Sequence, residues 1–266
     1  MASRPVAWVT GASRGMGAVT SVAFAEAGYD VAVTARDRAA LEAVAARVEA
    51  AGTAALVVPA DLTDRASVSA FADAALARFG RCDVLCNIGI YQGDGTRQLF
   101  MDTPIAELEA SLEADVVAPA LLCQRSVPSM LAAGGGTIVN MSSSSVFLDP
   151  PGTVRENGWS LAYVAAKAGI DRFASILNVE LGPSGIRAFN VEPGFVAYGQ
   201  DLETALRKYP GIPVSPPEAI GPAIVWLVQS PEADRLRSKR IYLPRLTHKH
   251  QLLAGWDGPG TSYPPR

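Results

Sequence analysis

The chain has 266 residues, a formal net charge of −3 and a sequence pI of about 5.5. Charged residues make up 18% and hydrophobic residues 49% of it, which excludes a disordered, self-repelling chain. The acidic balance excludes a global positive field that would hold nucleic acid or an anionic membrane, and no stretch reaches the ~18 apolar residues of a membrane span. With no apolar signal segment before the first strand, we expect a cytoplasmic protein.

The cysteines form no recognisable site. Cys82, Cys86 and Cys123 are too few for a disulfide framework in a chain of this length. A zinc site would need a second pair of ligands, and His248 and His250 lie far along in the tail. We predict reduced, structural thiols and no metal.

The first part of the chain alternates short β-branched runs with alanine-rich helical stretches. Strands are predicted at Val6–Thr10, Asp30–Ala35, Ala54–Val58 and Val84–Asn87. Helices are predicted from the glycine-rich turn after Thr10 to about Ala27, over 38–51 and over 65–79.

Two long helices are predicted in the second part of the chain. The first spans 105–132, with a bend at Pro119 because an interior proline removes a backbone donor; the second spans 160–181. The remaining predicted elements are strands at Thr137–Met141, Arg187–Val191 and 239–243, a substrate loop over 195–217, a helix over 217–229 and a C-terminal surface arm over 244–266.

This alternation predicts an α/β fold, a doubly wound parallel Rossmann-type sheet with helices on both faces. Neither an interdomain linker nor a repeat interrupts it, so residues 1–266 are expected to form a single domain. In such sheets the ligand crevice lies at the carboxyl ends of the strands.

The first strand leads into a glycine-rich turn at this end of the sheet. The turn contains Gly11, Ser13, Arg14, Gly15, Met16 and Gly17. Glycines allow a tight turn and a close approach of phosphate, and the following helix offers free N–H groups to a pyrophosphate. Glycine clusters alone are common, but the position at the first strand–helix junction favours a dinucleotide.

The end of the second strand indicates which dinucleotide. NAD-binding proteins carry an acid there for the ribose 2′-hydroxyl, whereas a nearby arginine accommodates the 2′-phosphate of NADP. This chain has Ala35 in that place, followed by Arg36, and Arg14 supplies a second guanidinium. We therefore predict NADP(H) as the cofactor, with Asp61 along its adenine side.

The second half of the chain contains residues that can transfer a proton to or from a substrate. Tyr163 and Lys167 are four residues apart, which puts them on one helix face. A phenol has a pKa of about 10, and an adjacent ammonium, together with the positive charge of an oxidised nicotinamide, favours the phenolate and lowers that value. Ser143 closes an earlier strand, where its hydroxyl can hold a carbonyl oxygen. Each feature alone is common; their combination is what predicts a reaction site.

These motifs together resemble the short-chain dehydrogenases/reductases of the short single-domain type. The resemblance comprises the turn at 10–17, Asp61-Leu62, Asn87-Ile88-Gly89, Ser143, Tyr163 with Lys167, Ala168-Gly169, Gly185-Ile186-Arg187 and Pro193-Gly194. It implies that Ser143 orients a carbonyl, that Tyr163 is the general acid/base and that Lys167 lowers the pKa of Tyr163 and binds the ribose. The cofactor-binding residues it implies are Gly11, Ser13, Arg14, Gly15, Met16, Gly17, Arg36, Asp61, Leu62, Asn87, Gly89, Tyr163, Lys167, Pro193 and Val196.

The chain departs from the family pattern at four places. Asp115 stands where the family has the asparagine of its proton relay; we count it with the catalytic residues, with the backbone carbonyl carrying the relay and the side chain mainly structural. The other departures are Ile88 for a small residue beside the cofactor, Ala197-Tyr198 for a threonine, and Leu243-Pro244-Arg245 for a Gly-Gly pair.

The resemblance implies an oxidoreductase for a ketone or secondary alcohol. Apolar residues flank the site and favour an apolar or aromatic-bearing small molecule: Phe147, Leu148, Pro150, Pro151, Trp159, Phe195, Tyr198, Leu202, Leu206, Tyr209 and Ile212. Their alternative role is packing of the loops onto the body of the protein.

Other readings of the sequence remain open. A 3-oxoacyl thioester is the alternative substrate, although Gly134 and Ser184 stand where such reductases carry carrier-docking arginines. A regulatory dinucleotide-binding protein with weak or no turnover is the alternative function. Because the family dimerises through its two long helices, we expect a homodimer or homotetramer.

Overall fold

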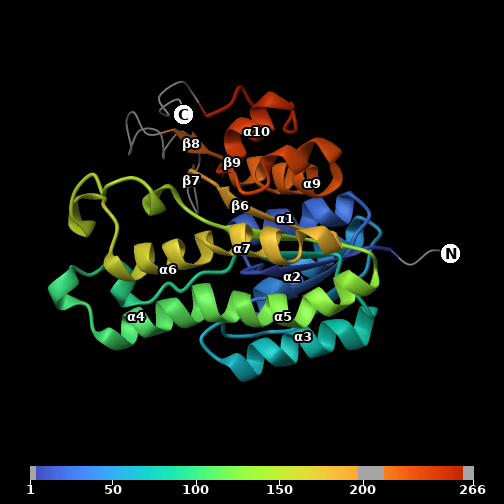
Figure 1. Cartoon of the computed structure of the whole chain (residues 1–266), viewed down its shortest axis with the longest axis horizontal. Helices are drawn as coiled ribbons and strands as arrows, with labels where there is room; N and C mark the ends of the chain where they lie inside the picture. The colour runs from blue at the N-terminus through green and yellow to red at the C-terminus, as the bar shows by residue number, and fades with distance from the viewer. Residues whose placement is uncertain (1–3, 197–212, 260–266) are drawn as a thin grey trace.

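The structure, a computed structural model, describes residues 4–196 and 213–259 (Figure 1). The described residues form a seven-stranded sheet in the order β3-β2-β1-β4-β5-β6-β9, and every neighbouring pair is parallel. Its strands are β1 (Val6–Thr10), β2 (Asp30–Thr34), β3 (Ala55–Val57), β4 (Val84–Asn87), β5 (Gly136–Met141), β6 (Ile186–Glu192) and β9 (Ile241–Tyr242). β7 (Phe195–Val196) and β8 (Val214–Ser215) pair separately. The strand order reverses where β1 lies beside β4, and ligands of open α/β sheets bind at such a point.

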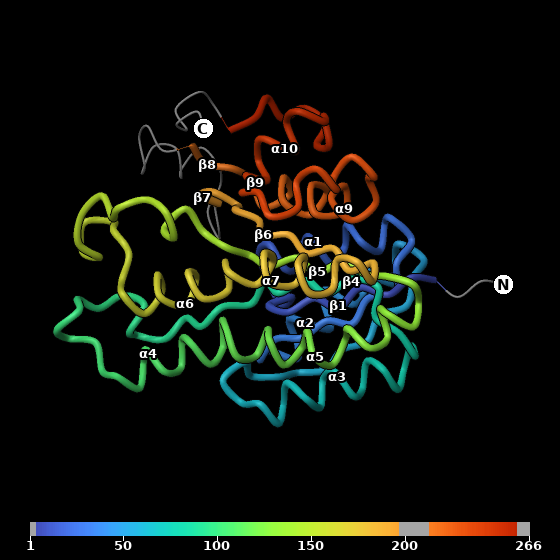
Figure 2. Tube along the Cα trace, in the orientation of Figure 1, coloured from blue at the N-terminus to red at the C-terminus, as the bar shows by residue number. Residues whose placement is uncertain are grey.

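Helices cover both faces of the sheet (Figures 1 and 2). They are α1 (Gly15–Glu26), α2 (Arg38–Ala50), α3 (Arg65–Phe79), α4 (Ile105–Leu112), α5 (Ala118–Ala132), α6 (Leu161–Asp171), α7 (Phe173–Glu180), α9 (Gly221–Gln229) and α10 (Leu243–Lys249). α1, α2 and α9 contribute to the core on one face, and α3, α5 and α7 to the core on the other. The predicted doubly wound α/β fold is confirmed.

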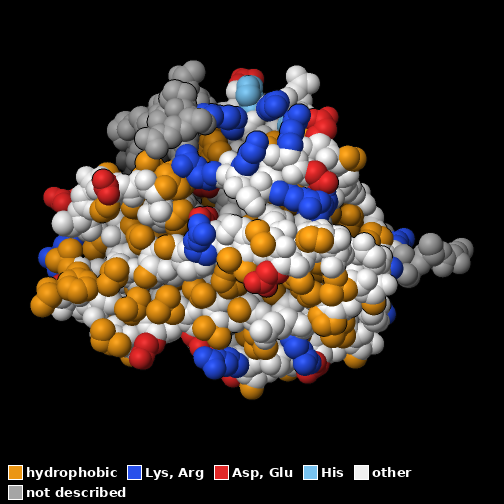
Figure 3. All heavy atoms as spheres, viewed as in Figure 1, with side chains coloured by type: hydrophobic (Ala, Val, Ile, Leu, Met, Phe, Trp, Pro, Cys, Tyr) orange, Lys and Arg blue, Asp and Glu red, His pale blue; other side chains and the backbone are white. Residues whose placement is uncertain are grey.

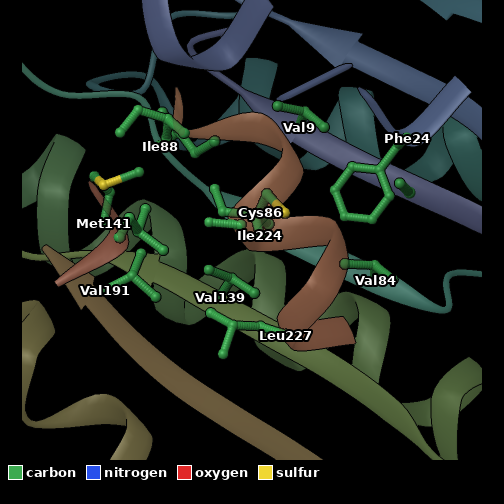
Figure 4. Packing of buried hydrophobic residues seen from close by; sticks show 14 of the residues in the cluster. Val9, Phe24, Val84, Cys86, Ile88, Val139, Met141, Val191, Ile224 and Leu227 are labelled. Atoms are coloured by element: carbon green, nitrogen blue, oxygen red, sulfur yellow. The ribbon is translucent and has the colours of Figure 1, made fainter. Parts of the chain in front are cut away.

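Alternation along the strands builds these two cores. In β1, Val9 joins one core and Trp8 the other. Trp8 meets Phe71 of α3 edge to face, with ring centroids 5.7 Å apart. On the opposite face, sheet residues pack against α1 and α9; Figure 4 shows Val9, Phe24, Val84, Cys86, Ile88, Val139, Met141, Val191, Ile224 and Leu227. Cys82, Cys86 and Cys123 are buried free thiols, as predicted.

The first long helix is interrupted, but not at Pro119. A π-helical turn, Glu113–Val117, separates α4 from α5. Pro119 lies in the first turn of α5, where a missing N–H is tolerated. The predicted bend at Pro119 is therefore wrong, and the interruption falls at Asp115.

The second long helix divides into α6 and α7 at Arg172. The side chain of Asn190 in β6 donates to the carbonyl oxygen of Asp171, the last residue of α6. The Asp171 carboxylate accepts from the Ser142 hydroxyl at 2.6 Å. The end of α6 is therefore tied to the sheet through both the backbone and the side chain of Asp171.

The prediction of a surface arm over 244–266 is wrong at its start. Residues Leu243–Lys249 form α10, which contacts α9, and Leu243 is fully buried. The Thr247 hydroxyl donates to the carbonyl oxygen of Ala219 at 2.5 Å. Pro244 lies in the first helical turn, where proline is tolerated, so the Pro-rich composition concealed a helix. Residues 260–266 lie outside the described ranges. No described helix is long and apolar enough to cross a membrane.

Candidate active site

The carboxyl ends of the three central strands are tied together by asparagines. Asn87 of β4, Asn140 of β5 and Asn190 of β6 share one register. Asn87 Nδ2 donates to Asn140 Oδ1 at 2.9 Å, and Asn140 Nδ2 donates to Asn190 Oδ1 at 3.2 Å. These two hydrogen bonds hold together the strand ends at which the reaction site is predicted.

Ser143 and Tyr163 meet at this edge. Ser143 follows β5, and its hydroxyl accepts from the backbone N–H of Ser145 at 3.2 Å. Ser160 caps α6 by accepting from the Tyr163 N–H at 3.3 Å, which places Tyr163 in the first turn. Burial raises the pKa of Tyr163, and a hydrogen bond between the Ser143 side chain and the Tyr163 hydroxyl opposes that rise.

Lys167 lies one turn further along α6 and is only 3% exposed. Its Nζ donates to the carbonyl oxygen of Met141 at 2.9 Å and lies 3.6 Å from Asp115 Oδ2. Burial lowers the pKa of Lys167, and the Asp115 carboxylate opposes that shift. The structure thus joins the ammonium to the end of β5 and to the π-helical turn.

The protein's own charges do not lower the pKa of Tyr163 overall. After burial, the carboxylates of Asp115 and Glu192 raise this pKa further, and the net direction is upward. Burial is the largest cause of this rise, and the two carboxylates add negative charge that disfavours the phenolate. The predicted lowering relied on the positive charge of an oxidised nicotinamide as well as on Lys167, and it stays a prediction for the cofactor-bound site.

The glycine-rich turn is built for close approach. Gly11 has φ +66°, and a Cβ there would lie 2.6 Å from the Cα of Gly89. The Thr10 hydroxyl accepts from the N–H groups of Ile88 and Gly89, each at 3.0 Å. The loops after β1 and β4 are therefore held against each other at the switch point.

The N-terminus of α1 suits a phosphate group. Arg14 occupies its N-cap with no side-chain hydrogen bond to the helix, and no acid stands in the first turn. By contrast, Asp37 caps α2 and Asp64 caps α3 through their carboxylates. The first N–H groups of α1 therefore have no carboxylate cap, and an anion can occupy that place.

Two of the predicted cofactor residues, Arg14 and Arg36, follow the carboxyl ends of β1 and β2. Arg14 donates to Gln92 Oε1 at 2.6 Å, and Arg36 is exposed directly after β2. A cavity of about 360 Å³, lined in part by Ser13, Arg14 and Gly15, lies beside α1 and α2 and not over Tyr163.

The predicted adenine side is held by local contacts. Asp61 Oδ1 accepts from the N–H and the hydroxyl of Thr63, both at 2.9 Å, so one carboxylate oxygen serves the turn itself. Leu62 lies against Gly89, close enough that a Cβ on Gly89 would be 2.7 Å from it. Met16 lies partly buried against the core.

The residues beside the predicted site differ in burial. Ile88 is 5% exposed and packs in the core with Val9 and Met141 (Figure 4). Pro193 and Val196 are buried after β6. Of the apolar flanking residues, Phe147, Leu148, Trp159 and Phe195 are half-buried, and Pro150 and Pro151 are exposed. Ala197, Tyr198, Leu202, Leu206, Tyr209 and Ile212 lie outside the described residues.

Three residues near the site were not predicted. Tyr91 reaches Asp115 through its backbone N–H, which leaves no signature in the sequence. Gln92 meets Arg14 only through the fold. Glu192 is a carboxylate 1% exposed at the end of β6, 3.6 Å from Arg240, whose guanidinium stacks 3.4 Å above the Phe147 ring. A charged residue ending an apolar strand was the available signal for Glu192.

Comparisons with known proteins agree with this geometry. The family model described as short chain dehydrogenase matches residues 5–208. The chain is 32% identical over 239 residues to D-threitol dehydrogenase of Mycolicibacterium smegmatis, covering 86% of this chain and 87% of that protein. It is 31% identical to a 3-oxoacyl-(acyl-carrier-protein) reductase of Synechocystis sp., covering 86% and 90%. A solved metagenomic short-chain oxidoreductase in complex with NADP superposes with a TM-score of 0.68 at 32% identity, covering 85% of this chain and 90% of that one.

Proposed function

Because the chain belongs to the short-chain dehydrogenase family and is an oxidoreductase using a nicotinamide cofactor, we propose that it transfers a hydride between NADP(H) and an apolar or aromatic-bearing ketone or secondary alcohol. The observation that carries the reaction type is the convergence of Ser143, Tyr163 and Lys167 at one edge of the sheet. A protein that only bound a dinucleotide would have no chemical need for this arrangement.

The residues present fit NADP(H). The α1 N-terminus, with Gly11, Gly15 and Gly17 in its turn, would hold the pyrophosphate. Arg14 and Arg36 would hold the 2′-phosphate, for which guanidinium groups are suited, and no acid at position 35 opposes it. The solved relative bound to NADP supports this preference.

The remaining predicted contacts complete the cofactor site. Asp61 and Leu62 would lie along the adenine, and Asn87, Gly89, Pro193 and Val196 along the nicotinamide half. The Lys167 ammonium has three N–H donors. One donates to the Met141 carbonyl oxygen and a second faces Asp115, which leaves the third for a ribose hydroxyl. When bound, the cofactor supplies or accepts the hydride.

The chain's own residues would manage the proton. In the reducing direction, the Ser143 and Tyr163 hydroxyls donate to the substrate carbonyl oxygen, and the Tyr163 proton moves to that oxygen as the alkoxide forms. In the oxidising direction, the Tyr163 phenolate accepts the proton of the alcohol. The half-buried rings of Phe147 and Trp159 would exclude water from the substrate side.

The substrate proposal rests on this chain's own residues, because the named activities of the relatives differ. The polyol and acyl-carrier activities belong to those proteins. A 3-oxoacyl thioester is the second candidate, favoured by the acyl-carrier relative. Against it, Gly134 and Ser184 offer no guanidinium at the carrier-docking positions.

We also expect the protein to form a homodimer or homotetramer and to be cytoplasmic. Hydrophobic side chains spread over the face formed by α4 to α7 (Figure 3). The large exposed ones on these helices are Ile105, Leu131, Leu161, Ile176 and Val179, with Val179 78% exposed. Such a face is unfavourable in water and suits a second copy of the chain.

A panel assay tests the proposed function. NADPH and NADH oxidation are followed with apolar ketones, quinones and 3-oxoacyl thioesters, using the native chain and Tyr163→Phe. NADPH-dependent turnover of ketones that the variant lacks is expected. Cofactor binding without turnover across the panel would instead favour the regulatory alternative.

A further inference from the structure

Arg240, the residue directly before β9, lies beside the loop that carries Ser143. β9 pairs with β6, and Glu192 at the end of β6 is in register with Tyr242. The Cζ of Arg240 lies 3.4 Å from the centroid of the Phe147 ring. Phe147 follows Ser143 by four residues, in the loop that leaves β5. The edge strand of the sheet therefore brings a cation to the loop of the Ser143 hydroxyl.

Two neighbours hold this guanidinium in place. The Phe147 ring covers one of its flat faces, in a cation–π contact. Its Nε lies 3.6 Å from Oε2 of Glu192, a carboxylate whose side chain is 1% exposed. The Arg240 side chain is 38% exposed, so part of it stays open to solvent. Arg240 is therefore oriented by the fold, unlike a freely rotating surface arginine.

The terminal nitrogens of Arg240 can serve a ligand. A guanidinium has five N–H donors, and Nε is the nitrogen that faces Glu192. Within residues 4–196 and 213–259, no group accepts a hydrogen bond from this guanidinium, because Glu192 lies just beyond hydrogen-bond distance. The two Nη atoms together form a planar fork that matches the two oxygens of a carboxylate.

The chain around Arg240 is strongly basic. Residues 235–250 contain six lysines and arginines and no aspartate or glutamate, in a protein whose net charge is −3. Lys239 and Arg245 are exposed on either side of β9 in the chain. Figure 3 shows Lys and Arg side chains gathered over the part of this face formed by β9 and α10. Such a surface raises the local concentration of anions near Arg240.

We infer that Arg240 binds a carboxylate of the substrate, and so selects ketones and alcohols that carry an acid group away from the reacting carbon. This inference rests on the proposed function, because Ser143 and Tyr163 hold the carbonyl oxygen at the other end of such a substrate. The half-buried Phe147 ring, beside the guanidinium, offers apolar surface to the body of the substrate.

A carboxylate fits this place better than a phosphate ester. A phosphate monoester carries about two negative charges near neutral pH and accepts from several donors. Arg240 supplies a single fork, and the buried Glu192 carboxylate beside it opposes a second negative charge on the ligand. One guanidinium next to one acid therefore suits a ligand with a single charge.

The test compares aromatic keto acids with their neutral esters. Reduction by NADPH of benzoylpropionate, its longer homologues and their methyl esters is followed for the native chain and for Arg240→Gln. We expect the native chain to prefer an acid over its ester, and the ratio of the two kcat/KM values to fall by about tenfold or more in the variant. Because acid and ester use the same Tyr163, a change in the pKa of Tyr163 cancels in this ratio.

Two control variants isolate the contribution of Arg240. Arg235→Gln removes an exposed arginine of the same basic segment, one that pairs with Glu232 at 2.9 Å, and should keep the native ratio. Glu192→Gln removes the opposing carboxylate and should raise the ratio. A native chain that prefers the esters overturns the inference, and so does a preference for the acid that survives in Arg240→Gln.

The folding of Arg240→Gln needs a safeguard, because the buried Glu192 loses the cation beside it. If this variant does not fold, the double variant Glu192→Gln/Arg240→Gln removes both charges together. It should lose the preference for the acid. A preference that persists in the double variant overturns the inference.

A binding measurement needs no turnover. Calorimetry gives the affinity of the full chain, with and without NADP, for phenylbutanoate, which has a ring and a carboxylate but no ketone. Binding that weakens by about tenfold or more in Arg240→Gln but not in Arg235→Gln supports the inference, even if no ketone is reduced and the proposed function fails. No binding to the native chain overturns it, as does tighter binding of phenylpropyl phosphate in the presence of NADP.

Discussion

The Lys167 ammonium donates a 2.9 Å hydrogen bond to the carbonyl oxygen of Met141, so the lysine of α6 is fixed to the end of β5. Ser143 follows the same strand two residues later and hydrogen-bonds Tyr163. The strand therefore positions both partners of the tyrosine. The positions of Lys167 and Tyr163 therefore depend on contacts with the end of β5 as well as on their spacing along α6.

This arrangement predicts that turnover depends on the Tyr163 hydroxyl. Tyr163→Phe keeps the ring but removes the proton donor, so kcat should fall by ~10²–10⁴ or more. NADPH affinity, measured by fluorescence titration, should change little because the phosphate and adenine contacts lie elsewhere. Near-native turnover in this variant would exclude Tyr163 as the general acid.

The NADP preference predicts an unequal effect on the two cofactors. Arg36→Ala should weaken NADPH binding by roughly 2 kcal/mol, the size of a charge-assisted hydrogen bond, and leave NADH binding nearly unchanged. Calorimetric titration of both cofactors measures this difference. Arg78→Ala is the matched control, since it removes the same charge from the last turn of α3. Equal losses for NADPH and NADH would contradict the assignment of Arg36.

The C-terminal helix predicts a stability effect that a surface arm would not show. Leu243 is fully buried where α10 meets the core, so Leu243→Ala should lower the free energy of unfolding by about 2–5 kcal/mol. Urea denaturation measures this change. Arg245→Ala, on the exposed side of the same helix, should stay within about 0.5 kcal/mol of the native protein. Similar values for the two variants would mean that α10 is not packed in solution.

The exposed face of α7 predicts an interface between copies of the chain. Ile176 is 51% and Val179 78% exposed on this helix. The double change Ile176→Glu/Val179→Glu places charges in the proposed contact and should shift the sedimentation coefficient toward that of a monomer. The control change Arg47→Glu on α2 should leave the sedimentation coefficient unchanged. A native chain that sediments as a monomer would remove the proposal.

The elements that could be predicted from the sequence are those with a local signature. Tyr163 and Lys167 share a helix face by spacing alone, and the alternating strands and helices fixed the α/β class. The π-helical turn at Asp115 could not be predicted, because such turns are rare and no proline or glycine within Glu113–Val117 marks one. The Tyr91 contact uses a backbone N–H, which every residue but proline has. The buried pair of Asp115 with Lys167 depends on two distant segments meeting, and no periodicity records that.

The two carboxylates near Tyr163 predict how the reaction depends on pH. Reduction needs the protonated phenol and oxidation the phenolate, so a raised pKa keeps reduction active to higher pH and makes oxidation rise with pH. Glu192→Gln removes one negative charge, which lowers the pKa of Tyr163, and the rising limb of oxidation should move to lower pH by up to about one unit. Arg240→Gln is the opposite change: it removes the cation that lies 3.6 Å from Glu192, so the carboxylate acts on Tyr163 less opposed and the limb should move to higher pH. The kcat/KM for alcohol oxidation, measured over pH for both variants, gives the two shifts.

We expect the two shifts to have opposite signs. A general loosening of the site would instead move both limbs the same way. Shifts of the same sign would therefore show that Glu192 does not act through its charge.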